Sequence, residues 1–246
     1  MSVRLHKPRL CENILHAKAR LNSKCFMISI RYTLVCIVFL TGIDYASAQT
    51  KPAFWDDIQT IKLYDKIYRP VQSPVLFTGS SSIRIWDNMA EMFKGYPVLN
   101  RGIGGTVLKD IDRYVEDIIV PYKPKQIILY IGENDIPSAP NGDSVFAGFQ
   151  RLYRHIRIFL PEVPIAYVSI KPSPSREKFM PIAVRANQLI RNFLRQEANT
   201  SFIDIYPLML DKEGHPRPEL FREDMLHMKA AGYEIWYKKI KPYLLK

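Results

Sequence analysis

The sequence predicts an α/β protein built on a sheet of five parallel strands. Short apolar runs, rich in β-branched and aromatic residues, alternate along the chain with longer segments of helical periodicity. The runs are short and mostly continuous in apolar residues, as expected of strands that are covered on both faces. No internal repeat or low-complexity run indicates a different architecture. The 198 residues after position 48 suit one domain of this kind.

The pattern predicts the order of the elements. A leading helix is expected over 55–68, before the first strand. The predicted strands cover 74–78, 98–103, 126–131, 164–170 and 201–205. Apolar side chains at helical spacing predict four crossover helices within 85–93, 107–118, 146–156 and 186–194, and a closing helix within 233–240.

The first 48 residues have the layout of a secretory signal peptide. An apolar run over 34–40 follows Arg31 and precedes Ala46-Ser47-Ala48, which suits a signal peptidase. The run is much shorter than the roughly 20 apolar residues of a membrane span. We therefore expect cleavage after Ala48, export to the periplasm or the medium, and no stable membrane span afterwards. Residues 1–26 are basic, and the sequence leaves open whether they are a translated extension or a stretch upstream of a true start at Met27.

Composition limits the chemistry of the mature chain. All cysteines fall within the predicted signal, so neither a disulfide nor a thiolate metal site is expected; they are Cys11, Cys25 and Cys36. The three histidines after position 48 lack the paired spacing of a zinc site; they are His155, His215 and His227. The net charge of +11 falls to about +6 without residues 1–48, and the remaining charges form no basic stripe for a nucleic acid. We expect no metal, no cofactor and no nucleic-acid partner.

A serine follows the first predicted strand at a strand-to-helix turn. In a parallel sheet, reactive residues lie in the loops at the carboxyl ends of the strands. Gly79-Ser80-Ser81-Ser82 occupies such a loop, where a serine is presented to solvent and backbone N–H groups at the helix start can stabilise an oxyanion. By itself this segment is weak evidence, because serine-rich turns before helices are more often simple N-caps.

Two further loops can bring hydrogen-bond donors to the same edge of the sheet. Gly105 follows the second strand and offers a backbone N–H. A dinucleotide fingerprint is rejected here, because its third glycine would fall at Val107. After the third strand, Gly132-Glu133-Asn134-Asp135 offers the side-chain amide of Asn134, although a simple polar turn would use the same residue types.

A carboxylate and an imidazole lie three residues apart just before the closing helix. Asp224 and His227 can be held in contact by one short loop. A serine nucleophile needs a base that takes its proton and an acid that orients the base, and this pair can supply both. A single histidine near a helix start is commonly a surface residue, so the interpretation depends on the combination with the other loops.

Taken in order, these four segments resemble the diagnostic blocks of the SGNH hydrolase superfamily, also called GDSL-like lipases or acylhydrolases. The form Gly-Ser-Ser-Ser is similar to bacterial members near the platelet-activating-factor acetylhydrolase type. The resemblance implies a flavodoxin-like three-layer α/β/α sandwich over 49–246. It also implies that Ser81 is the nucleophile, with His227 as base and Asp224 as its partner. The implied oxyanion hole consists of the N–H groups of Ser81 and Gly105 and the amide of Asn134.

Two positions depart from the family pattern. Ser80 stands where the name-giving motif has aspartate, and Thr106 follows the oxyanion glycine in place of other polar residues. Neither position handles the proton, so we expect these changes to affect subgroup and substrate. Ile83 stands where an ordinary α/β-hydrolase has the second glycine of G-x-S-x-G, which excludes that class.

The function expected from these observations is that of a secreted serine esterase. The short segment 135–143 leaves little room for a lid, which predicts a shallow cleft and short acyl groups, with O-acetyl esters on carbohydrates preferred. A phospholipid, lysophospholipid or platelet-activating-factor-like acylhydrolase is an alternative, as is acyl transfer to a sugar. An alternative of another class is a non-catalytic glycan-binding protein. The expected partner is a small-molecule or polysaccharide ester, and the sequence does not determine an oligomeric state.

Overall fold

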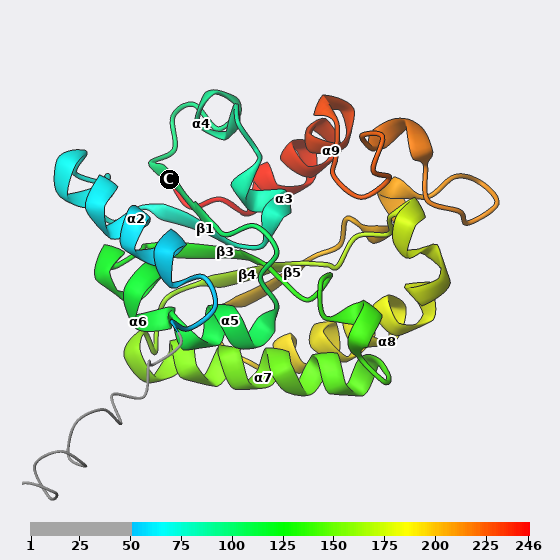
Figure 1. The fold of residues 1–246 in the computed structure, drawn as a ribbon, viewed down its shortest axis with the longest axis horizontal. Helices are drawn as coiled ribbons and strands as arrows, with labels where there is room; N and C mark the ends of the chain where they lie inside the picture. The colour runs from blue at the N-terminus through cyan, green and yellow to red at the C-terminus, as the bar shows by residue number, and fades with distance from the viewer. Residues whose placement is uncertain (1–50) are drawn as a thin grey trace, which may run out of the picture. The chain divides into compact units, whose positions relative to one another are not determined.

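Five parallel strands form one sheet in the computed structural model, which describes residues 51–246. The predicted signal peptide lies outside the described residues. The sheet order is β2-β1-β3-β4-β5 (Figure 1), the order of flavodoxin-like sheets, and it confirms the predicted fold class. The strands are β1 (Val75–Gly79), β2 (Val98–Gly102), β3 (Gln126–Tyr130), β4 (Ile165–Val168) and β5 (Thr200–Ile203). Residues Pro52–Lys246 form one compact unit.

The register of the central strands aligns three strand ends. Gly79 at the end of β1 pairs with Gly102 of β2 and with Tyr130 of β3. The loops that leave these strands therefore start side by side at one edge of the sheet. All the predicted site residues outside the Asp224–His227 segment belong to these three loops.

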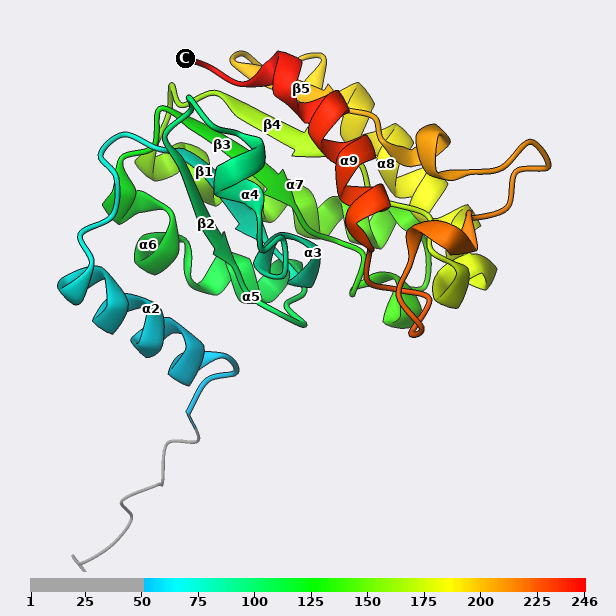
Figure 2. The same cartoon turned by 90° about the horizontal axis from the view of Figure 1, so that it is seen from above.

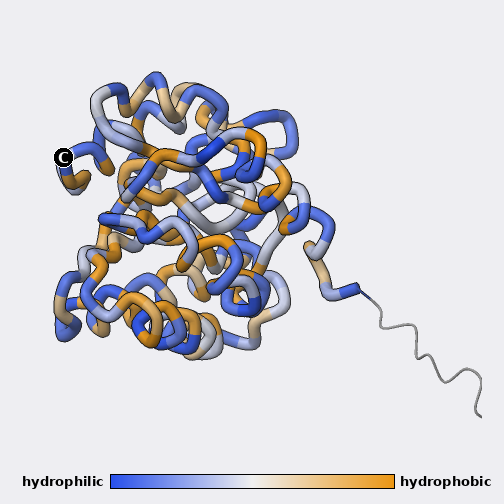
Figure 3. The backbone as a smooth tube through the Cα atoms, turned by 90° about the vertical axis from the view of Figure 1, so that its left-hand side faces the viewer, coloured by the Kyte–Doolittle hydropathy of each residue, from blue (hydrophilic) through white to orange (hydrophobic). Residues whose placement is uncertain are grey.

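Helices cover both faces of the sheet, as Figures 1 and 2 show. One face packs against α2 (Trp55–Ile67), α5 (Leu108–Arg113), α6 (Val115–Ile118), α7 (Gly142–Phe159) and α8 (Met180–Leu194). The other packs against α3 (Ser81–Arg84), α4 (Met89–Met92) and α9 (Ala230–Ile240). Along these helices hydrophobic and hydrophilic stretches alternate (Figure 3), because each buries only its inner side.

The two core layers differ in character. The layer under α3, α4 and α9 holds a cluster of rings in which Trp86 contacts Phe77, Phe93 and Trp236 at 5.4–6.1 Å between centroids. The opposite layer is mostly aliphatic, with a smaller ring cluster around Phe149. Together the two layers bury both faces of every central strand, which explains why the strand sequences are apolar throughout.

Two of the predicted crossover helices are divided into short pieces. The stretch 107–118 forms α5 and α6, which are separated at Tyr114, whose hydroxyl donates to the carbonyl of Ala53 at 2.7 Å. In the stretch 85–93 only the part Met89–Met92 is helical, as α4, and the buried Trp86 lies between it and α3, which ends at Arg84. Apolar periodicity predicted burial in both stretches, although neither forms one continuous helix. No helix within residues 51–246 is long and apolar enough to cross a membrane.

Candidate active site

A glycine fixes the turn that carries the candidate nucleophile. Gly79 ends β1 with φ +132°, and a Cβ at this position would lie 1.7 Å from the carbonyl oxygen of Tyr130. Only glycine fits this approach. The turn lets the N–H of Ser80 donate to that same carbonyl at 3.1 Å, and Ser81 then begins α3. Because Ser81 is the first helical residue, its own N–H has no acceptor among residues 51–246.

Ser81, His227 and Asp224 lie in one chain of hydrogen bonds. The Nε2 atom of His227 is 3.0 Å from the Oγ of Ser81, and its Nδ1 is 2.6 Å from Oδ2 of Asp224. The backbone N–H groups of Leu226 and His227 both donate to Oδ1 of Asp224 at 2.9 Å. Ionised Asp224 keeps the proton on Nδ1, so the lone pair of Nε2 faces the serine hydroxyl.

Hydrogen bonding keeps Asp224 ionised. Burial alone raises the pKa of this carboxyl, but the hydrogen bonds from the His227 ring and from the backbone N–H groups of His227 and Leu226 outweigh it and lower the pKa to about 2. The loop that makes these bonds is closed by an antiparallel bridge between Phe221 and Met228. These hydrogen bonds favour the ionised form of the carboxylate and orient it toward the His227 ring.

Gly105 and Asn134 are brought to the same edge of the sheet. The Nδ2 of Asn134 donates to the carbonyl of Thr106 at 3.0 Å, which links the loops after β2 and β3. Thr106 in turn donates from its buried hydroxyl to Ile103 at 3.0 Å and lies 3.4 Å from the carbonyl of Gly79. The second amide hydrogen of Asn134 has no acceptor in the described part of the chain, and neither does the N–H of Gly105. Three donors without an acceptor among the described residues thus lie in loops that leave neighbouring strands at the same edge of the sheet.

Asp135 supports this arrangement, and the sequence reasoning assigned it no role. Its carboxylate accepts the N–H of Leu108 at 3.1 and 3.2 Å and so caps the start of α5, directly after the Gly105–Thr106 turn. Burial raises the pKa of Asp135 to about 6. The sequence signal was available, because an aspartate follows Asn134 in the same loop.

A buried ion pair beneath the site was also missed. Lys171 pairs with Glu133, and their side chains are 0% and 4% exposed. The Glu133 carboxylate also accepts from Tyr130 at 2.9 Å and from Ser173 at 3.2 Å. Burial lowers the pKa of Lys171, and the neighbouring carboxylate opposes that shift. Both charged residues follow neighbouring strands by three positions, a signal that was present in the sequence.

The other serines and histidines take different places. The hydroxyls of Ser80 and Ser82 are buried and have no hydrogen-bond partner within residues 51–246. His155 pairs with Asp112 at 2.9 Å, and His215 pairs with Glu177 at 2.5 Å, both away from Ser81's hydrogen-bond chain. In the part of the chain that the structure describes, no group of three His, Cys, Asp or Glu side chains is arranged to hold a metal ion.

A serine, a histidine and an aspartate linked by hydrogen bonds at the carboxyl edge of a parallel sheet form an arrangement that recurs in hydrolases acting by acyl transfer. Residues 76–235 match the GDSL-like Lipase/Acylhydrolase family, and the chain belongs to that family. The match confirms the resemblance derived from the four sequence blocks. A search of curated protein sequences found no significant match.

Solved structures with the same fold include hydrolases of this family. A Streptococcus pneumoniae protein described as a platelet activating factor is 23% identical, with a TM-score of 0.67 over 77% of this chain and 92% of that one. A GDSL-like lipase from Bacteroides thetaiotaomicron is 17% identical, with a TM-score of 0.63 over 76% and 96%. An acetyl-xylooligosaccharide esterase from Geobacillus is 15% identical, with a TM-score of 0.57 over 72% and 97%. At these identities the likeness concerns the fold.

Proposed function

We propose that this protein is a secreted serine esterase that removes short acyl groups, preferably acetyl, from carbohydrates. The observation that carries the proposal is the hydrogen-bond chain from Ser81 through His227 to Asp224. A histidine whose Nε2 faces a serine hydroxyl while its Nδ1 is held by a carboxylate is ready to act as a general base. The family to which the chain belongs supports ester hydrolysis as the reaction.

The first half of the reaction acylates the enzyme. Oγ of Ser81 attacks the carbonyl carbon of the ester while Nε2 of His227 takes the serine proton. The carbonyl oxygen becomes an oxyanion, which the N–H groups of Ser81 and Gly105 and the amide of Asn134 stabilise. When the tetrahedral intermediate collapses, the bond to the alcohol oxygen breaks, and protonated His227 gives its proton to the leaving alcohol.

The second half releases the acid. His227 takes a proton from water, and the resulting hydroxide attacks the acyl carbon bound to Ser81. The same three donors stabilise the second oxyanion. Collapse breaks the bond to Oγ, which recovers its proton from His227, and the carboxylic acid leaves. Asp224 stays ionised throughout and stabilises the imidazolium.

The openness of the site supports a short acyl group. The side chains of His227 and Asp224 are 28% and 48% exposed, so the acid–base pair is accessible from solvent. The segment after Asn134 forms a single short turn at Ile136–Ser138 before α7 begins at Gly142, which leaves no room for a long lid. An open site suits an ester displayed on a polymer. The Geobacillus relative, an acetyl-xylooligosaccharide esterase, makes acetylated xylan the first substrate to test.

The decisive experiment compares the wild type with Ser81→Ala on p-nitrophenyl acetate. We expect the variant to lose about 10⁴–10⁶ of kcat, because nucleophilic catalysis is removed while binding remains. Ser82→Ala is the matched control, since that neighbouring hydroxyl has no hydrogen-bond partner within residues 51–246, and it should keep full activity. Equal rates for wild type and Ser81→Ala would end the esterase proposal and favour a glycan-binding protein.

A chain-length series separates the substrate classes. Rates on p-nitrophenyl acetate, butyrate and octanoate should fall as the acyl chain becomes longer. Incubation with acetylated xylan should then release free acetate from the polymer. A preference for the octanoate, or for a phospholipid with an acetyl group over acetylated xylan, would instead support the lipid-directed alternative. Appearance of acetylated sugar acceptor in place of free acetate would identify acyl transfer.

Secretion is a separate part of the proposal. It depends on the signal-peptide layout of residues 1–48, which lie outside the described part of the chain. N-terminal sequencing of the exported protein should begin at Gln49. Recovery of the intact chain from the cell interior would contradict export.

A further inference from the structure

The ion pair between Lys171 and Glu133 is almost completely buried, although burying two charges does not by itself add to stability. Removing two charges from water is costly, and well-packed apolar residues in place of a buried pair commonly leave a protein at least as stable. This pair sits where β3 and β4 end, three residues beyond each strand, and it is completed by Tyr130 and Ser173. A buried position is therefore occupied by charged and polar groups close to the edge of the sheet that carries Ser81.

The segment after β4 contacts the loop that holds the acid and the base. The Nζ of Lys171 lies 5.7 Å from the ring centroid of Phe221, the residue whose bridge to Met228 closes that loop. Four residues further on, the N–H of Ser175 donates to the carbonyl of Met225 at 3.0 Å. Met225 lies between Asp224 and His227 and has a left-handed backbone, with φ 54°. The loop is thus held at its base and at its tip by one segment.

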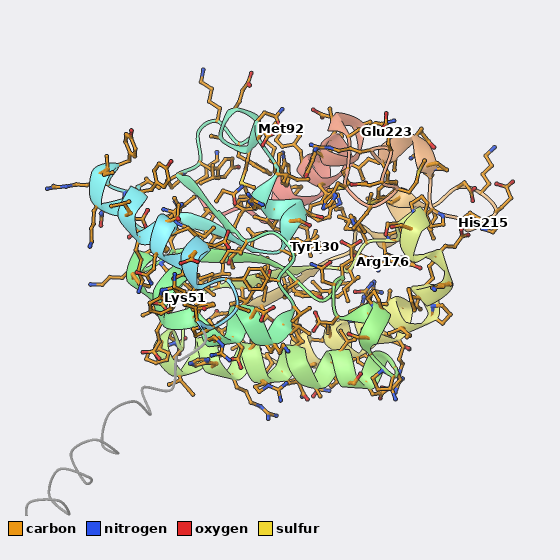
Figure 4. All side chains as sticks on the ribbon, in the orientation of Figure 1. Lys51, Met92, Tyr130, Arg176, His215 and Glu223 are labelled. Carbon is orange, nitrogen blue, oxygen red and sulfur yellow. The ribbon has the colours of Figure 1, made fainter. Side chains whose placement is uncertain are left out.

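The buried pair of Lys171 and Glu133 also interacts electrostatically with Asp224. Asp224 and Arg176 both act electrostatically on Lys171, with opposite sign, and Glu133 neutralises the lysine directly. Tyr130 reaches the network from β3 and packs its ring against Trp236 of α9, 4.6 Å between centroids. Figure 4 labels Tyr130, Arg176 and Glu223, which mark the end of β3, the segment after β4 and the loop before α9.

We propose that Lys171 and Glu133 form a positioning unit that holds the loop 222–227 at the distance from Ser81 that proton transfer requires. Neither residue touches the reacting atoms. Glu133 is held by Tyr130 at the end of β3 and by Ser173 in the segment after β4, it fixes the ammonium group, and the ammonium group supports Phe221 at the base of the loop. The inference rests on the proposed function, because the ion pair is proposed to maintain the distance between His227 and Ser81.

The test compares Lys171→Met, Glu133→Gln and the double variant. Each single variant leaves one buried charge without its partner, so stability falls together with kcat. The double variant is neutral and keeps acceptors and donors for Tyr130 and Ser173, so its unfolding midpoint should return close to that of the wild type. Its kcat on p-nitrophenyl acetate should stay at least about tenfold low, with KM nearly unchanged, because the loop is no longer held in place.

Arg191→Met is a control for a more exposed ion pair away from the site, with side chains that are 38% and 30% exposed. Arg191 also combines an ion pair, with Asp204, and a ring contact, 4.7 Å above Phe202, but it touches neither loop of the site. Its removal should lower stability and leave kcat unchanged. The proposal is overturned if kcat of the double variant recovers together with stability, or if folded Lys171→Met keeps the wild-type kcat. Either result, obtained with an enzyme whose activity still depends on Ser81, leaves the proposed function intact.

Discussion

At the scale of single residues, the site is decided by which of three consecutive serines meets a base. Ser80 and Ser82 have the same side chain as Ser81, but their hydroxyls point into the protein and bond to nothing within residues 51–246. At the start of α3 only the hydroxyl of Ser81 faces His227. Which serine can serve as the proposed nucleophile therefore depends on the backbone conformation of this turn, which Gly79 sets.

The oxyanion donors give a prediction at this scale. Asn134→Ala should lower kcat by about 10²–10³-fold with little change in KM, because its amide acts on charge that develops in the transition state. Steady-state kinetics on p-nitrophenyl acetate measure this. Asn141→Ala is the control, since that asparagine caps α7 and its loss should cost about 1 kcal/mol of stability without affecting kcat. A large rise in KM for Asn134→Ala would contradict an oxyanion role.

Asp135 gives a prediction about pH. Its pKa is raised to about 6 in the folded protein, above its ordinary value of 3.8, so the ionised form is disfavoured by folding. Between pH 3.8 and about 6 the folded state therefore binds more protons than the unfolded state. Protonated Asp135 contributes to the free energy of unfolding at low pH, and this contribution is lost as the pH rises through about 6. Asp135→Asn removes this titration while keeping an acceptor for Leu108.

Urea unfolding at several pH values tests this expectation. The wild type should lose stability between about pH 4 and about pH 7, and Asp135→Asn should not. The free energy of unfolding of the variant minus that of the wild type should therefore increase over this range and then stay level. A difference between the two proteins that is constant across this range would show that Asp135 does not titrate as burial predicts.

At the scale of elements, the turn between β1 and α3 is the most constrained connection at the site. Gly79→Ala should cost at least about 2 kcal/mol, since it adds a collision with the carbonyl of Tyr130 to an unfavourable φ. Gly95→Ala is the matched control, because Gly95 also has a positive φ, +95°, but has open space around it, so only about 1 kcal/mol is expected. Thermal unfolding of both variants measures the difference. Equal losses would mean that the close approach to β3 is relieved easily.

Element positions could be predicted from the sequence where one physical signal dominated. The three central strands are mostly apolar because both of their faces are buried, and the predicted positions of all five strands agree with the structure to within two residues at either end. The division of 107–118 at Tyr114 could not be predicted, because it depends on a hydrogen bond to Ala53, a contact between residues far apart in the chain. Apolar periodicity predicts which side of a helix is buried, but it does not predict where the helix is divided into shorter pieces.

The candidate site shows the same limit. Ser81, Asp224 and His227 could be found because catalysis requires particular residue types in loops whose order along the chain is known. Lys171 and Glu133 were missed because an isolated lysine or glutamate in a loop is normally solvated, and only the pairing of β3 with β4 brings the two together. Residues that act through another residue leave weaker patterns than residues that act on a substrate.

At the scale of the whole molecule, the sheet couples two core layers. Trp86 and Trp236 both lie in the layer beneath α9, whereas Phe149 lies in the opposite layer among Tyr153, Tyr167 and Phe193. A substitution in one layer should therefore be detected by tryptophans in the other, provided that the domain unfolds as a unit.

Phe149→Ala tests this coupling. We expect a loss of about 3–5 kcal/mol, because a fully buried ring is replaced by a cavity. Tryptophan fluorescence and far-UV circular dichroism should report the same lowered midpoint. A fluorescence midpoint that stays at the wild-type value while the dichroism transition moves would show that the two layers unfold separately.

The bridge between Phe221 and Met228 has a consequence for how such proteins diversify. It makes Asp224 and His227 part of one closed loop, while Ser81 begins α3 directly after β1, so the candidate site joins two separate segments through the hydrogen bond between His227 and Ser81. We expect that chain inserted before Phe221 would change the surroundings of the site without separating Asp224 from His227. An insertion there is the way of changing the substrate range that would disturb the proposed triad least.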